Sequence, residues 1–129
     1  MPFDVLDLLA VIAAVWHTVR KLDVMKRRPE DYPHVSTDDF MAWRESERAA
    51  YALGSWASFL KLALDPALWL LAPQLGLPEA LQRTLAAVID VGWAIAVIAA
   101  TLRAGRARRR RDELGIALHE PPPSDESSD

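Results

Sequence analysis

The sequence predicts an all-α fold, a three-helix integral membrane protein whose consecutive helices run antiparallel (up-down-up). The chain of 129 residues is rich in Ala and Leu and has only 5 Gly, a composition typical of helices. Its apolar residues gather in three blocks, at 5–19, 49–72 and 85–102, and the charged residues lie between and after these blocks. A block of this kind approaches the ~20 residues that a helix needs to cross a bilayer.

The distribution of Lys and Arg predicts the orientation in the membrane. Thirteen of the 15 basic residues lie between the first two blocks or after the third, and only Arg83 lies between the second and the third. Basic loops face the cytoplasm, so we expect an outer N-terminus and a cytoplasmic C-terminus in the inner (cytoplasmic) membrane. The expected multi-pass spans are about 5–20, 48–72 and 82–103.

The first two helices have clear boundaries in the sequence. We expect the first over residues 3–26, because Pro29 follows and disfavours helical geometry in the residue before it. Ser36 is a candidate N-cap for the second helix, with Asp39 at the third helical position. We expect this helix to end at the Asp65-Pro66 pair, and a short interfacial helix to follow over 66–72.

The third helix is expected to open at Pro78 and to run to about Arg103 or beyond. A basic run follows, which we expect to attract anionic lipid at the membrane surface; it comprises Arg106, Arg108, Arg109, Arg110 and Arg111. The last residues are acidic and rich in Pro and Ser, a composition typical of disorder. These features predict a membrane domain over 1–112 and a disordered cytoplasmic tail over 113–129.

Three charged residues stand within the predicted spans: Asp7, Lys61 and Asp90. Each lies 13 residues from an Arg at the cytoplasmic edge, which places all three at one depth, ~20 Å above that edge. A charge at the centre of a span costs ~2.5–3.5 kcal/mol, so pairing of Lys61 with Asp7 or Asp90 is one interpretation. Pairing of Lys61 with Asp65 and separate snorkelling to the outer interface are the alternatives.

Small residues recur every four positions on two of the helices, a spacing that lets helices approach closely in lipid. The predicted helix-packing residues are Ala50, Gly54 and Ser58 on the second helix and Gly92, Ala96 and Ala100 on the third. In an Ala-rich chain such a run can also arise by chance.

No pattern of catalytic or cofactor-binding residues emerges. The three histidines have no metal-ligand spacing, and Gly-rich phosphate loops and cysteine are absent from the sequence. We interpret His17 as satisfying a local hydrogen bond in preference to ligating haem or chlorophyll. The basic run follows an apolar span directly, so we expect it to face lipid and not nucleic acid. We therefore expect no enzyme activity, no cofactor and no metal.

The leading functional hypothesis is a structural or accessory component that binds partners in the membrane, either another membrane protein or further copies of this chain. A second hypothesis is a homo-oligomeric channel or lesion former. Three spans, an outer N-terminus and a basic cytoplasmic tail resemble the topology of phage class I holins. A soluble helical interaction module is the third hypothesis, supported by the 26% of charged residues.

Overall fold

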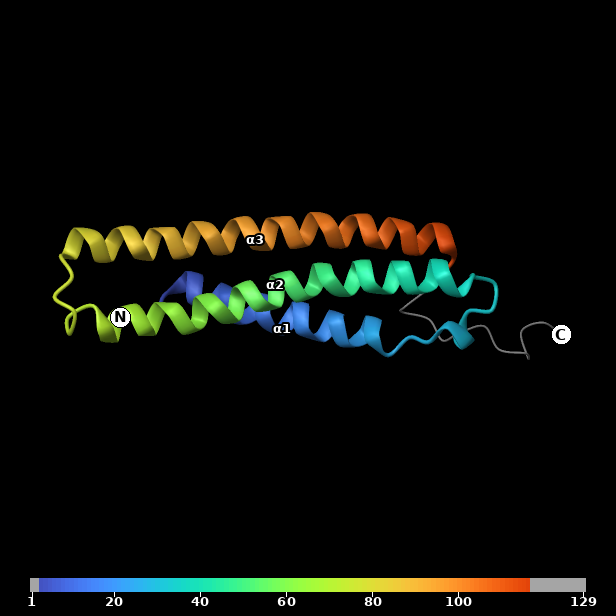
Figure 1. Ribbon diagram of the computed structural model, residues 1–129, viewed down its shortest axis with the longest axis horizontal. Helices are drawn as coiled ribbons and strands as arrows, with labels where there is room; N and C mark the ends of the chain where they lie inside the picture. The colour runs from blue at the N-terminus through green and yellow to red at the C-terminus, as the bar shows by residue number, and fades with distance from the viewer. Residues whose placement is uncertain (1–2, 117–129) are drawn as a thin grey trace.

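The computed structural model describes residues 3–116 and consists of three long helices (Figure 1). In chain order the elements are α1 (Val5–Met25), the 3₁₀ helix η1 (Pro29–Asp31), α2 (Thr37–Leu71) and α3 (Glu79–Leu114). Consecutive helices are antiparallel, and α2 packs against both α1 and α3 (Figure 1). The predicted all-α, antiparallel three-helix architecture is confirmed. Most of the predicted disordered tail lies outside the described residues.

α1 begins with a reciprocal capping box. The Asp4 carboxylate accepts a hydrogen bond from the Asp7 backbone N–H (3.0 Å), and the Asp7 carboxylate accepts one from the Asp4 N–H (3.1 Å). Two of the unpaired N–H groups at the start of the helix are thereby satisfied. Asp7 therefore holds the first turn of α1 in place, a role that the spacing of three residues from Asp4 could have indicated in the sequence.

α2 begins where the sequence predicts and ends later. Ser36 caps it, its hydroxyl accepting a hydrogen bond from the Asp39 N–H at 3.2 Å. The predicted break at Asp65-Pro66 and the separate helix over 66–72 are wrong, because α2 continues through Pro66 to Leu71. The Asp65 carboxylate is bound by Lys61 one turn earlier, so it is not free to cap a new helix. Pro66 removes a single backbone hydrogen bond, which a 35-residue packed helix tolerates.

α3 runs well beyond Arg103 and includes the whole basic run. Gly115 ends it with a φ of +75°, a left-handed conformation that suits glycine. The chain then turns back, so that Ile116 is buried and the Gly115 carbonyl lies 3.1 Å from His34 Nε2. The packed helical unit thus reaches four residues past the expected domain boundary at residue 112.

A conventional hydrophobic core occupies only one end of the molecule, which we call the η1 end because η1 lies there. Its buried cluster is Val24, Tyr32, Phe40, Trp43, Ala50, Tyr51, Ala104 and Ile116. Phe40 packs edge-to-face on Trp43 and is stacked with Tyr32. Beyond this cluster, the side chains buried between the helices are small or polar, as with Ala14, Ser58 and Lys61.

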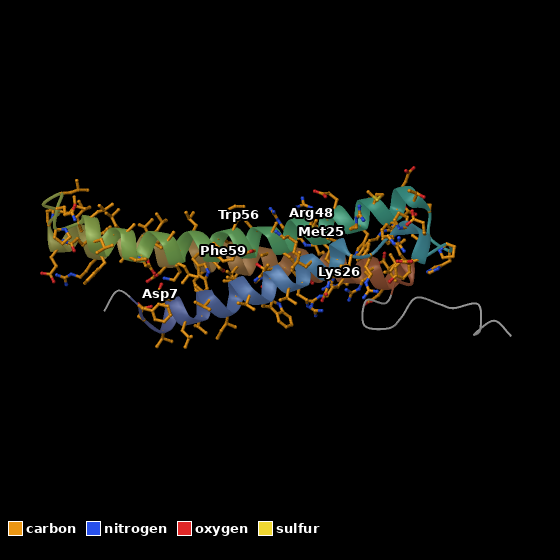
Figure 2. The ribbon with its side chains drawn as sticks, turned by 90° about the horizontal axis from the view of Figure 1, so that it is seen from below. Asp7, Met25, Lys26, Arg48, Trp56 and Phe59 are labelled. Atoms are coloured by element: carbon orange, nitrogen blue, oxygen red, sulfur yellow. The ribbon has the colours of Figure 1, made fainter. Side chains whose placement is uncertain are left out.

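Large apolar side chains cover the outside of the remaining length. Twenty-seven of them are exposed in the described residues, and between Met25 and Trp56 the only one is Met41. They come from α1, α2 and α3, and include Trp56 and Phe59 of α2 (Figure 2). α3 is long and apolar enough to cross a membrane; its most apolar 18-residue window has a mean hydropathy of 2.2 and is 6% buried. The molecule therefore has a polar interior and an apolar exterior over most of its length.

Candidate functional site: a buried lysine among three aspartates

Lys61 joins the three helices at one point. Its side chain is 1% exposed, and its Nζ lies 2.6 Å from Asp65 Oδ2, 2.6 Å from Asp90 Oδ1 and 3.3 Å from Asp7 Oδ1. The structure thus brings together Asp7, Lys61 and Asp90, the three charged residues within the predicted spans. Asp65, which lies on α2 with Lys61, is the fourth member of the cluster. One ammonium group with its three N–H donors meets a carboxylate from α1, one from α2 and one from α3.

Local structure explains why these four side chains converge. The capping box fixes Asp7 at the start of α1, and the i, i+4 spacing of a helix brings Asp65 beside Lys61. On the side of the cluster toward the η1 end, the Trp93 indole N–H donates a hydrogen bond to the Ser58 hydroxyl at 3.0 Å. The Trp93 ring also faces the Lys61 ammonium, with 5.8 Å between Nζ and the ring centroid. Trp93 therefore closes the ionic cluster on that side.

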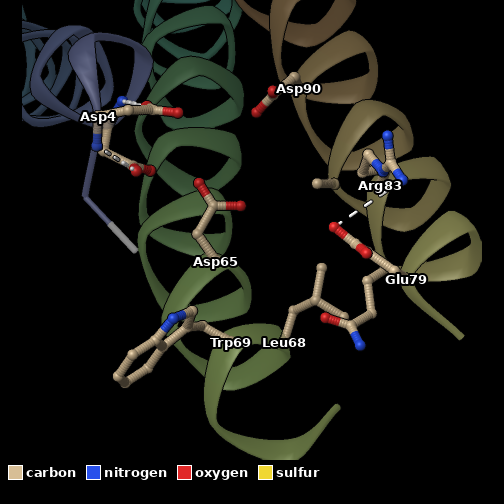
Figure 3. Close-up of a pocket in the computed structure, with 10 residues that line it drawn as sticks. Asp4, Asp65, Leu68, Trp69, Glu79, Arg83 and Asp90 are labelled. Carbon is tan, nitrogen blue, oxygen red and sulfur yellow. Dashed lines mark hydrogen bonds and ion pairs between the residues drawn. The ribbon is translucent and has the colours of Figure 1, made fainter. Parts of the chain in front are cut away.

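The three aspartates of the cluster line a cavity of about 520 Å³ between the ends of the helices away from η1 (Figure 3). Acidic side chains dominate its lining, which comprises Asp4, Asp7, Asp65, Leu68, Trp69, Glu79, Gln82, Arg83, Ala86 and Asp90. Arg83 Nη2 lies 3.8 Å from Glu79 Oε1, one turn earlier on α3. Three carboxylates surround one ammonium, so the cluster carries formal negative charge. Among the described residues, no group of His, Asp or Glu has an arrangement that would hold a metal ion.

A second buried ionic contact lies at the η1 end. Glu47 is fully buried; its Oε1 lies 3.3 Å from Arg111 Nη1 and accepts a hydrogen bond from the Tyr51 hydroxyl at 3.2 Å. Burial raises the pKa of Glu47 above its usual range, although the Arg111 guanidinium and the Tyr51 hydrogen bond oppose that shift. Sequence analysis missed this pair. The sequence feature that could have predicted its burial is that Glu47 shares one helical face with Ala50, Gly54, Ser58 and Lys61.

His17 occupies the middle of the α1–α2 contact. Its Nδ1 lies 2.7 Å from the Ala13 carbonyl oxygen, the local hydrogen bond expected from the sequence. The ring packs edge-on against Tyr51 and directly over Gly54, where an added Cβ would come within 2.3 Å of the His17 Cδ2 atom. Next to it, the hydroxyls of Thr18 and Ser55 are 2.8 Å apart. Gly54 therefore admits a histidine from α1.

The predicted helix-packing residues divide between different surroundings. Ala50, Gly54, Ser58 and Ala100 are buried between helices, and Ala96 is half-buried. Gly92 is exposed, and a Cβ added there would meet no described atom within 4 Å. Within the described chain, Gly92 therefore lies outside the helix contacts.

The five arginines of the basic run also differ in exposure. Arg106, Arg109 and Arg110 are exposed and Arg108 is half-buried, whereas Arg111 is buried against Glu47. Arg110 also reaches acidic groups, 3.6 Å from Asp39 and 3.5 Å from Glu113. Four arginines of this run thus remain available at the surface, and the fifth holds α3 against α2.

No family model matches the sequence, and no curated protein or solved structure is similar enough to count as a match.

Proposed function

We propose that the protein is a multi-pass membrane protein in which all three helices cross the inner membrane, and that it serves as a structural or accessory component for a partner in that membrane. The observation that carries the proposal is the inverted distribution of side chains: large apolar groups outside, and Lys61, Asp7, His17 and Ser58 inside. In water the exposed apolar surface would be costly, at ~25 cal/mol per Å². In lipid that cost disappears, whereas the buried polar groups need the partners that they have.

The charge distribution supports an outer N-terminus and a cytoplasmic η1 end. The conventional core at the η1 end resembles that of a small water-soluble unit, with apolar groups buried and exposed apolar groups sparse. The same end carries nearly all of the Lys and Arg residues, as the positive-inside rule requires of a cytoplasmic face. The acidic cavity beside Lys61 then opens toward the outer side of the membrane.

The exposed side of α3 supports a role in binding a partner. α3 packs against α2 and leaves a strip of its surface open, which includes Thr84, Ala87, Val91 and Ile95. Close packing on small residues such as Thr84 and Ala87 is a common basis for helix association in membranes. The partner in this proposal is another membrane protein or a second copy of the chain.

The proposal is tested by placing a photo-crosslinking residue at Val91 in the full chain expressed in cells. We expect extraction of the chain to require detergent and irradiation to give one discrete protein adduct. The same residue at Ile12, an exposed apolar position on α1, is the matched control and should give only lipid adducts. Recovery in the soluble fraction would contradict membrane insertion. Lipid adducts alone at Val91 would contradict the accessory role.

A further inference from the structure

Two hollows lie along the seam between α2 and α3. The first, of about 260 Å³, is near the η1 end and is lined by Ser46, Ala49, Ala50, Arg103 and Arg106. The second, of about 310 Å³, lies further toward the other end and is lined mainly by apolar atoms, including those of Leu60, Val88, Gly92 and Ala96. One hollow is thus basic and the other apolar.

Helical periodicity places both hollows on one side of the seam. Residues three or four positions apart share a helix face. The stripe on α2 is Ser46, Ala50, Leu53, Ala57, Leu60 and Leu64. The stripe on α3 is Arg106, Arg103, Ala99, Ala96, Gly92 and Val88. α1 approaches α2 elsewhere, through Tyr51 and Ser55, so it leaves this side of the seam uncovered.

The basic hollow is suited to a phosphate group. Arg103 and Arg106 lie one turn apart, and both are exposed. Neither forms an ion pair with any described residue, in contrast to Arg110 and Arg111. Guanidinium groups bind phosphate oxygens through paired N–H donors, and the Ser46 hydroxyl offers one more donor at the same place.

The apolar hollow is suited to an acyl chain. Gly92 and Ala96 leave space between the larger side chains of Leu60 and Val88. Arg103 and Gly92 are 11 residues apart on α3, which corresponds to ~16 Å along the helix axis. Half of a ~30 Å hydrocarbon core is ~15 Å, so the seam from the arginines to Gly92 matches the depth of one leaflet.

We infer that the α2–α3 seam binds one anionic phospholipid of the cytoplasmic leaflet. Its phosphate lies between Arg103 and Arg106 beside Ser46, and one acyl chain follows the seam across Ala96 and Gly92. The inference rests on the proposed insertion of the helices in the membrane. Complementary charge selects the occupant, because the uncompensated arginines stand where an inner-leaflet headgroup would lie.

Native mass spectrometry of the full chain in detergent tests this inference, with titration of dioleoyl phosphatidylglycerol or dioleoyl phosphatidylcholine. We expect one phosphatidylglycerol to be retained per chain and to bind at least tenfold more tightly than phosphatidylcholine. The double variant Arg103→Gln/Arg106→Gln should lose at least tenfold in affinity for phosphatidylglycerol. The control Arg28→Gln/Arg109→Gln removes the same charge from exposed positions outside the hollow, and should stay within twofold of the wild type.

A second pair of variants tests the path of the acyl chain. Gly92→Leu should fill the apolar hollow and reduce retention of phosphatidylglycerol at least tenfold. Gly105→Leu is the matched control, since that glycine of α3 also has open space around it, away from the seam. It should leave lipid binding unchanged.

Several results would overturn the inference. Equal losses in both arginine double variants would show general attraction to the basic surface. If glycerol 3-phosphate displaced phosphatidylglycerol as well as added phosphatidylglycerol does, the site would bind a headgroup and no acyl chain. A dimer in place of the lipid-bound species would show that a second copy of the chain fills the seam. Failure of the underlying membrane proposal is distinguishable, because the chain would then be recovered without detergent.

Discussion

At the scale of single residues, Lys61 has the largest energetic consequence. An ammonium group with 1% exposure is tolerable only while its carboxylate partners surround it. Asp7 and Asp90 differ in how much they depend on that ammonium, because their side chains are 3% and 31% exposed. Water can solvate the Asp90 carboxylate in part, whereas the Asp7 carboxylate depends on Lys61 and on the capping bond from Asp4.

Lys61→Met should therefore lower the free energy of unfolding by ~3–5 kcal/mol, because it leaves buried carboxylates without their counter-charge. Adding Asp7→Asn should restore more of that loss than adding Asp90→Asn. Unfolding in mixed micelles, followed by circular dichroism, measures all three variants. Arg83→Met is the control and should change stability by less than ~0.5 kcal/mol, since its ion pair is exposed. Equal stability of the single and both double variants would contradict the pairing.

Alanine substitutions of Gly54 and Gly92 test whether α1 packs closely on α2 at Gly54. Gly54→Ala should destabilise the protein by ~1–3 kcal/mol, because its methyl group would overlap the His17 ring. Gly92→Ala meets open space and should be neutral or stabilising by up to ~1 kcal/mol, since Ala favours helix more than Gly. The same unfolding measurement separates them. Similar effects of both substitutions would show that His17 does not pack on Gly54.

At the scale of helices, sequence patterns predicted what depends on local chemistry. The Ser36 cap and the common depth of Asp7, Lys61 and Asp90 follow from side-chain type and a rise of 1.5 Å per residue. The continuity of α2 through Pro66 was not predicted, because an Asp-Pro pair locally favours the start of a new helix, whereas packing along the whole helix decides the outcome. Glu47 was missed because a lone Glu in a charged stretch is usually solvent-exposed.

The Glu47–Arg111 contact predicts a pH dependence at the junction of α2 and α3, outside the proposed spans. The folded state holds the Glu47 proton more tightly than the unfolded state, where the pKa is near 4.5. Its contribution to stability is therefore fully present below pH 4.5 and is lost as the pH rises through the folded-state pKa.

Compared with Glu47→Gln, the wild type should thus lose free energy of unfolding as the pH rises from about 4.5 through the folded-state pKa of Glu47. Unfolding of both proteins across this range, in the same detergent, gives the difference. Glu45→Gln is the control, because Glu45 is exposed on the same helix. If the free energy of unfolding of the wild type instead rises with pH relative to Glu47→Gln, the attraction between Glu47 and Arg111 outweighs the cost of burial.

At the scale of the whole molecule, the two ends have opposite construction. The η1 end buries Phe40, Trp43 and Tyr32, as a water-soluble protein would. Along the rest of the molecule, ion pairs and hydrogen bonds lie inside and apolar groups outside. This distribution supports the proposal that one end meets water and the remaining length meets lipid. The proposed topology accordingly has three crossings.

Cysteine labelling tests that topology directly, because the native chain has no cysteine. Phe3→Cys, Glu30→Cys and Gln74→Cys are made one at a time at exposed positions outside the three long helices, and intact spheroplasts are treated with a membrane-impermeant maleimide. We expect labelling of the cysteines at positions 3 and 74 from outside, and labelling at position 30 only after permeabilisation. Labelling at position 30 in intact spheroplasts, or protection at position 74, would contradict the three-crossing topology.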